Sequence, residues 1–296
     1  MFFYFFDSPH KSLHEKVKLI DTSTPKALVA SFCTGSFAPF RKKFFFRGEG
    51  NGESLIPSLL RNDNYSRFCC VKKSNLQAGK TPLNEFLKTE YIILHRFYFE
   101  ANQAGLVLPE TESFTRWDCS PGAGIFPHSI YIHDLAHLMA LGDHYGLSTR
   151  MLDFSFDPLT AIYFACSHLH HPASNKPIIL YLLDKTLFVE KSRIRCVVPE
   201  YFKNPNLKAQ NGALVYWAVS KSESFVGDEV KDPEDKIEFD SFGKIHDINK
   251  YLYEINITRS FSTRLLSLLD AMGYNSQSLF PNYADIASHI CPKPNR

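Results

Sequence analysis

The fold is decided by residues 133–166, HDLAHLMALGDHYGLSTRMLDFSFDPLTAIYFAC. Leu135 and Leu138 begin a row of apolar residues at helical spacing, which predicts a helix in the first part of this stretch. Gly146 predicts the end of that helix, because glycine takes the left-handed conformation that often follows the last turn. An extended segment over residues 149–154 is expected next.

A second helix is predicted over residues 159–166. Ser155 or Asp157 can cap it, and Pro158 suits its first turn, where the N–H that proline lacks would have no partner. The helix is apolar almost all round, so it should be buried. Polar side chains between two such helices must find hydrogen-bond partners or line a cleft. They are His144, Thr149, Arg150, Asp153, Ser155 and Asp157.

The composition is that of a globular protein with one large domain or two small ones: 296 residues, 44% hydrophobic and 22% charged. The formal charge of +2 gives no reason to expect a nucleic-acid or membrane partner. Neither the N-terminal MFFYFF nor any other run approaches the ~20 apolar residues of a membrane helix. The seven cysteines form no pair of CxxC motifs, so we expect reduced thiols and a cytoplasmic location.

Predicted helices and strands alternate along the chain without a Rossmann fingerprint, which indicates an α+β fold with a mixed central sheet flanked by helices. Phe44–Phe46 predicts a strand, and three glycines within residues 48–52 predict a loop that a ligand can approach. Residues 1–43 are expected to be an N-terminal extension, of which residues 1 to about 24 form a strand or a docking arm, and residues 44–296 the main domain. Further helices are predicted over 83–101, 259–272 and from near Tyr283, and further strands over 177–184, 213–219 and 250–257.

The central stretch resembles the pattern Gln-His-Tyr-Gly-Leu-Pro-Thr-Arg-Leu-Leu-Asp-Trp-Thr of FRG domains, a widespread and mostly bacterial family. Residues 143–155 keep most of it, as DHYGLSTRMLDFS. The upstream Phe46-Arg47-Gly48 matches the motif that names the family. Residues 55–61, 209–217 and 279–287 also match in order, so the resemblance covers roughly residues 44 to 290. The departures from the central pattern are Asp143, Ser148, Met151, Phe154 and Ser155.

The resemblance implies a role in phage-defence or toxin-like bacterial loci, to which many FRG proteins are assigned. The order of elements also resembles that of ADP-ribosyltransferases, and this fold is taken as a hypothesis. In those enzymes a first-strand arginine or histidine, often followed by glycine, holds NAD, and a later Ser or Thr lines the nicotinamide pocket. Arg47-Gly48 and Ser155 would take these places. Gln210 would stand where the third strand usually supplies a glutamate, unless Glu200, Glu223 or Glu238 is the missing carboxylate.

Side-chain chemistry leaves a choice at three positions. The Arg47 guanidinium beside a glycine-rich loop suits a phosphate or carboxylate ligand, or it is a structural arginine paired with a carboxylate such as Asp153. Arg150 is three residues from Asp153, so these two side chains could form an internal ion pair. His144 can transfer a proton, bind a ligand or be held by the backbone.

The sequence leaves three candidate functions. The first is an NAD- or nucleotide-binding, ADP-ribosyltransferase-like enzyme, for which NAD would be a substrate and not a cofactor. The second is a non-catalytic module that binds a small ligand or a protein, and the third is docking of a partner, which the sequence does not identify, by the aromatic N-terminus.

His133 and His137 have a spacing that can bind zinc, but no further ligands can be placed, so no metal site is expected. The candidate residues are His144 and Gln210 for catalysis, and Arg47, Gly48, Thr149, Arg150, Asp153, Ser155 and Tyr163 for ligand binding.

Overall fold

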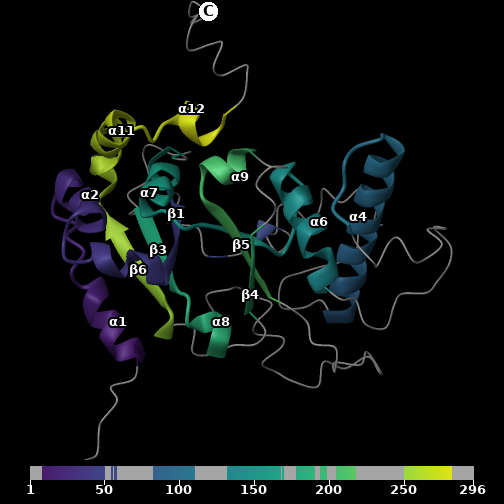
Figure 1. Cartoon of the computed structure of the whole chain (residues 1–296), viewed down its shortest axis with the longest axis horizontal. Helices are drawn as coiled ribbons and strands as arrows, with labels where there is room; N and C mark the ends of the chain where they lie inside the picture. The colour runs from purple at the N-terminus through teal and green to yellow at the C-terminus, as the bar shows by residue number, and fades with distance from the viewer. Residues whose placement is uncertain are drawn as a thin grey trace, which may run out of the picture.

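The computed structural model describes residues 9–50, 55, 57–58, 83–110, 132–167, 169, 178–190, 194–198, 205–217 and 250–281. Helices and strands are both present in this part of the chain, which confirms the α+β class (Figure 1). In chain order the elements are α1 Pro9–Val17, α2 Pro25–Cys33, the 3-10 helix η1 Ala38–Lys43, β1 Phe44–Glu49, α4 Leu83–Gln103, α6 Ile132–His144, β2 Leu152–Ser155, α7 Pro158–Ser167, β3 Ile178–Asp184, α8 Leu187–Glu190, β4 Ile194–Val197, α9 Pro205–Ala209, β5 Gly212–Trp217, β6 Leu252–Ile257, the 3-10 helix η6 Arg259–Phe261, α11 Ser262–Ala271 and α12 Ser276–Leu279.

The central sheet has six strands in the order β4-β5-β2-β1-β3-β6, with helices packed around it as expected. Its strand directions, expected to be mixed, are antiparallel at every described pairing. Each strand therefore begins at the end of the sheet where its neighbour finishes. Antiparallel neighbours do not need a helix that returns the chain to the opposite end of the sheet, whereas parallel neighbours do.

The sheet consists of two halves that are joined at one place. β1 pairs with β3 at six positions and β2 pairs with β5 at four. In contrast, β1 and β2 pair at a single described position, Phe46 opposite Ser155. The halves are thus β1-β3-β6 and β2-β5-β4. The place where pairing stops, between Arg47–Glu49 and Leu152–Phe154, is called the β1–β2 fork below.

Aromatic rings and a lysine close the other end of this joint. The rings of Phe45 and Phe156 lie 4.8 Å apart between centroids. The Lys185 ammonium lies 4.6 Å from the first centroid and 4.8 Å from the second, and it donates a hydrogen bond to the Lys42 carbonyl. Burial lowers the pKa of Lys185, as expected for an ammonium between two rings. This cation–π contact fastens the two half-sheets together where β1 and β2 meet.

The β1-β3-β6 half is covered by one apolar core. Phe44 and Phe46 of β1 pack there with Ile162 of α7 and Leu265 of α11, all fully buried. α1 lies where a strand or an arm was expected, and α1 and α2 both contribute to the same core. Phe32 of α2, for example, is wholly buried.

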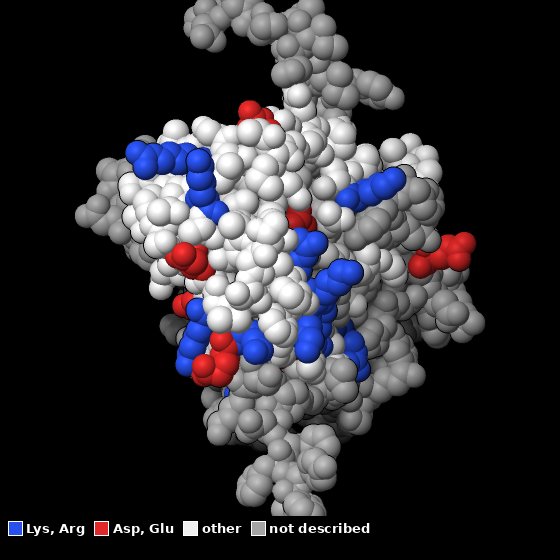
Figure 2. All heavy atoms as spheres, turned by 60° about the vertical axis from the view of Figure 1, so that its left-hand side comes forward, with Lys and Arg blue, Asp and Glu red and all other residues white. Residues whose placement is uncertain are grey.

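The other core contains α4 and α6 and reaches β2 and β5. Figure 1 shows α4 and α6 at one end of the molecule and α1, α2 and α11 at the other. The end that carries α1, α2 and α11 presents charged side chains of both signs, in keeping with the small net charge (Figure 2). Within the described ranges, no helix combines the length and apolar character needed to cross a membrane.

The central stretch folds largely as its local patterns predict. α6 ends at His144, and Gly146 follows with a φ of +86°. α7 begins at Pro158, and the Asp157 carboxylate caps it by accepting a hydrogen bond from the Leu159 N–H at 3.2 Å. Most of the α7 side chains are buried, as expected. The short helix expected from near Tyr283 lies outside the described residues.

Candidate functional site

Arg47 and Gly48 point to opposite faces of the half-sheet. A Cβ atom added to Gly48 would lie 1.8 Å from the Ala161 carbonyl oxygen, so α7 packs directly on this face of β1. Because side chains alternate along a strand, Arg47 faces away from α7. Gly48, expected as a ligand-binding residue, is thus placed against a helix, and its role here is to let α7 approach.

The Arg47 side chain bridges the mouth of the fork. If β1 and β2 stayed paired, Gly48 would lie opposite Asp153; instead the Arg47 Nη1 donates a hydrogen bond to the Asp153 carbonyl oxygen at 2.8 Å. The Arg47 Nε is buried and has no hydrogen-bond partner among the described residues. A buried N–H without an acceptor is unfavourable, so an acceptor brought by a ligand would bind well here.

The Asp153 side chain faces the same side of the sheet as that of Ser155 two residues later, away from Arg47, and His144 lies near its carboxylate. The Asp153 side chain is exposed, since Arg47 takes its backbone carbonyl and not its carboxylate. Although His144 is exposed as a residue, burial of part of its ring lowers its pKa from the usual 6.5, and the Asp153 charge acts in the opposite direction. The imidazole is therefore mainly neutral at pH 7 and able to accept a proton.

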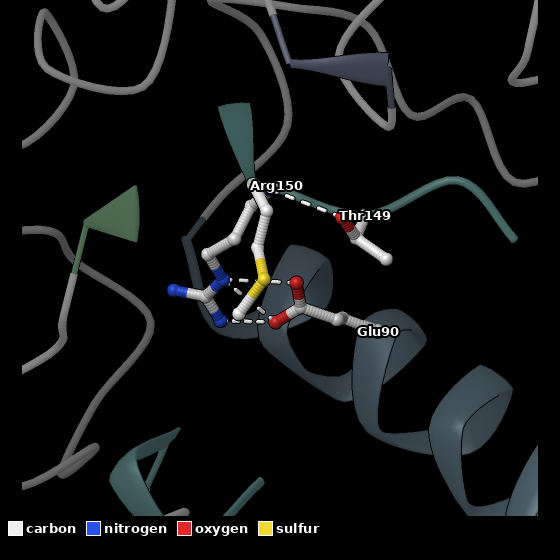
Figure 3. Close-up of polar contacts among 4 residues, drawn as sticks. Glu90, Thr149 and Arg150 are labelled. Atoms are coloured by element: carbon white, nitrogen blue, oxygen red, sulfur yellow. Dashed lines mark hydrogen bonds and ion pairs between the residues drawn. The ribbon is translucent and has the colours of Figure 1, made fainter. Parts of the chain in front are cut away.

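Thr149 and Arg150 do not face the fork, because both are buried and hydrogen-bonded to other parts of the chain. The Thr149 hydroxyl donates to the Asp143 carboxylate at 2.8 Å and accepts from the Met151 N–H at 3.1 Å. The Arg150 Nε donates to both Glu90 oxygens at 2.9 Å, and its Nη2 also contacts Glu90 (Figure 3). Arg150 is thus paired with Glu90 of α4, and not with Asp153 as the sequence spacing suggested.

Ser155 and Gln210 are close together but are engaged by the backbone. The Ser155 hydroxyl donates to the Gln210 carbonyl at 2.7 Å and accepts from the Asp157 N–H at 2.9 Å. The Gln210 side-chain amide donates to the Leu279 carbonyl at 3.0 Å and so holds α12 against the start of β5. Because Ser155 lies opposite Phe46, its side chain is on the α7 face, away from Arg47.

Tyr163 is also away from the fork, because it belongs to α7. It is half-buried, and burial raises its pKa, with the Asp270 carboxylate of α11 acting in the same direction. The structure therefore brings Arg47 to the Asp153 backbone carbonyl and His144 near the Asp153 carboxylate, while Tyr163 lies on α7. The parts of the chain that the structure describes contain no group of three His, Cys, Asp or Glu side chains suited to a metal ion.

Two residues near Arg47 were missed by sequence reasoning. Tyr181 of β3 lies directly opposite Arg47, and Glu254 of β6 lies directly opposite Tyr181. No short motif marks either residue. The alternating pattern of residues 250–257 could have put Glu254 on the opposite face from its apolar neighbours, but only the strand register connects it to Arg47.

Comparison with known proteins gives one match. The family model of the FRG domain matches residues 42–174, a segment that includes β1, β2, α7 and therefore both sides of the fork. No curated protein and no solved structure matches the chain.

Proposed function

We propose that this chain, whose residues 42–174 match the FRG domain, binds a nucleotide at the β1–β2 fork, with NAD as the first candidate. The observation that carries the proposal is the buried Nε of Arg47, which has no described acceptor where β1 and β2 stop pairing. A guanidinium in this position can offer two parallel N–H groups to a phosphate.

The surroundings of Arg47 support an anionic ligand. The partly buried guanidinium is less screened by water than a surface arginine, which strengthens its attraction for phosphate.

A second candidate function is ADP-ribosyl transfer from NAD. It is favoured because Arg47, Ser155 and Gln210 belong to β1, β2 and the start of β5, which are neighbours in the sheet, in the order that the transferase resemblance implies. In that reaction the bond between ribose and nicotinamide breaks, and the ribose carbon bonds to an acceptor oxygen. His144 would take the acceptor's proton.

The weak point of the transfer reaction is position 210. A carboxylate near the breaking bond would stabilise the positive charge that develops on the ribose, but Gln210 has an amide, and its N–H bonds the Leu279 carbonyl. This favours binding without turnover, in which the protein acts as a ligand-sensing module. A bacterial defence or toxin-like system, as the FRG family suggests, could use either activity.

The test is calorimetric titration of the purified chain with NAD, ADP-ribose and ATP, repeated with Arg47→Ala and Arg47→Lys. Loss of a charge-assisted hydrogen bond predicts at least about tenfold weaker binding for both variants, since lysine cannot form the two-pronged contact. Arg96→Ala, which removes an exposed arginine from α4, is the matched control and should bind like the wild type. Wild-type affinity in the Arg47→Ala variant would exclude the fork as the site.

Nicotinamide release separates the two candidate functions. Incubation of the protein with NAD and a mixture of acceptor proteins should release nicotinamide if the chain is a transferase, and the release should disappear in Arg47→Ala. Binding of NAD with no release after prolonged incubation would establish the non-catalytic module.

A further inference from the structure

A row of three polar side chains crosses the half-sheet on the face that points away from α7. Arg47 of β1 lies opposite Tyr181 of β3, and Tyr181 lies opposite Glu254 of β6. Directly opposed residues in adjacent strands point to the same face, with Cβ atoms about 5 Å apart. The row therefore runs from a cation through a phenol to a carboxylate over about 10 Å.

Tyr181 is the unusual member of this row. It is 4% exposed although it lies between two charged side chains of the row. Burial raises the pKa of Tyr181 to about 12, with the Glu254 and Glu49 carboxylates acting in the same direction and Arg47 opposing them. The phenol is thus protonated at neutral pH and remains a hydrogen-bond donor next to the guanidinium.

Glu254 makes the two ends of the row electrostatically different. It is exposed at the end away from the fork, and its charge repels phosphate there while Arg47 attracts phosphate at the other end. A carboxylate is also a strong acceptor for a pair of neighbouring hydroxyl groups. A ligand that satisfies the whole row has a phosphate at one end and free hydroxyls at the other.

From this juxtaposition we infer that Tyr181 and Glu254 select ribonucleotides: the 5′-phosphate binds Arg47, and the ribose hydroxyls bind Tyr181 and Glu254. The inference rests on the proposed nucleotide site and adds its ligand class and the orientation of the ligand. The site discriminates against 2′-deoxy sugars, because removing the hydroxyl leaves the carboxylate without its donor.

The test compares ADP with 2′-deoxy-ADP and 3′-deoxy-ADP by calorimetric titration of the full chain. The wild type should bind ADP about tenfold more tightly than at least one deoxy analogue, as expected for a hydrogen bond to a charged group. Glu254→Gln should reduce that preference to less than about threefold, since the acceptor loses its charge. Tyr181→Phe should weaken the binding of ADP about threefold to tenfold.

Tyr253→Phe is the matched control. Tyr253 lies on β6 next to Glu254 but points to the opposite face, where its hydroxyl donates to the Lys250 carbonyl. This variant should keep both the affinity and the preference of the wild type. Glu254→Gln changes an exposed side chain to one of the same shape, so it tests the inference even if Tyr181→Phe does not fold.

The two proposals fail in different ways. If the wild type binds no nucleotide, the proposed function is wrong and the ribose inference falls with it. If the wild type binds ADP and loses it in Arg47→Ala, but does not distinguish ADP from its deoxy analogues, only the ribose inference is overturned. The same conclusion follows if Glu254→Gln keeps the full preference.

Discussion

The buried ion pair between Arg150 and Glu90 provides a decisive test, because the sequence suggested a ligand-binding role for Arg150 and the structure shows a structural one. The two side chains are 3% and 6% exposed, and three N–H···O contacts join them. We predict that Arg150→Met and Glu90→Leu each destabilise the protein strongly, while the double variant recovers most of the loss.

The magnitude follows from burial. Removing one partner leaves an uncompensated charge in the interior, which costs about 3–5 kcal/mol. Replacing both by apolar residues of similar volume is often neutral or stabilising by about 1–4 kcal/mol. A change of 1 kcal/mol shifts the melting temperature by roughly 2–4 °C in a domain of this size class, so each single variant should melt about 6–20 °C lower.

The assay is thermal unfolding of the wild type, both single variants and the double variant, followed by nucleotide titration of the double variant. A structural Arg150 predicts that the double variant regains stability and nucleotide affinity together. A stable double variant that binds no nucleotide, next to a wild type that does, would show that Arg150 contacts the ligand. Single variants that melt like the wild type would refute the ion pair itself.

Two further outcomes are expected at the fork. Gly48→Ala should destabilise the protein by about 3 kcal/mol or more in thermal unfolding, because the new Cβ would lie 1.8 Å from a backbone oxygen of α7; an unchanged melting temperature would contradict this packing. His144 should titrate below pH 6.5 in an NMR titration, and Asp153→Asn should lower its pKa further by removing the carboxylate that favours the imidazolium. An unchanged His144 pKa in that variant would mean that the two groups do not interact.

Local steric rules were sufficient to predict the ends of several helices. Gly146 and Gly273 both have a φ of +86° and follow the ends of α6 and α11. Pro158 begins α7 as a first-turn proline. These residues act through their own backbone conformation, which depends little on the rest of the chain.

The N-terminal helices were not predicted, although one local signal was present. Thr24 and Pro25 were interpreted as a break, but Thr24 caps α2 by accepting a hydrogen bond from the Ala27 N–H, and Pro25 is in the first turn. α2 has only nine residues, so its apolar residues give a weak periodic pattern. Their burial depends on the surface that β1 and α7 offer, and a short helix shows little of this in its own sequence.

Which residues form the site could be predicted only in part, because the partner of each polar side chain depends on contacts that are distant in sequence. Arg47 bonds the Asp153 carbonyl and His144 lies near the Asp153 carboxylate, whereas Arg150 is held by Glu90, 60 residues earlier. Nothing in the spacing of residues 144–157 distinguishes these outcomes. Strand register decides them, and register is set by apolar faces that are distant in sequence.

The alternation of β1 explains how three consecutive residues can serve both the fold and the site. Phe46 enters the apolar core and Gly48 lies under α7, so both face one side, and Arg47 between them must face the other. The guanidinium is therefore held by a strand whose opposite face is locked by close packing. A side chain placed under α7 would shift β1 and move Arg47 relative to Asp153, so Gly48→Ala should weaken nucleotide binding even though Gly48 faces away from the fork.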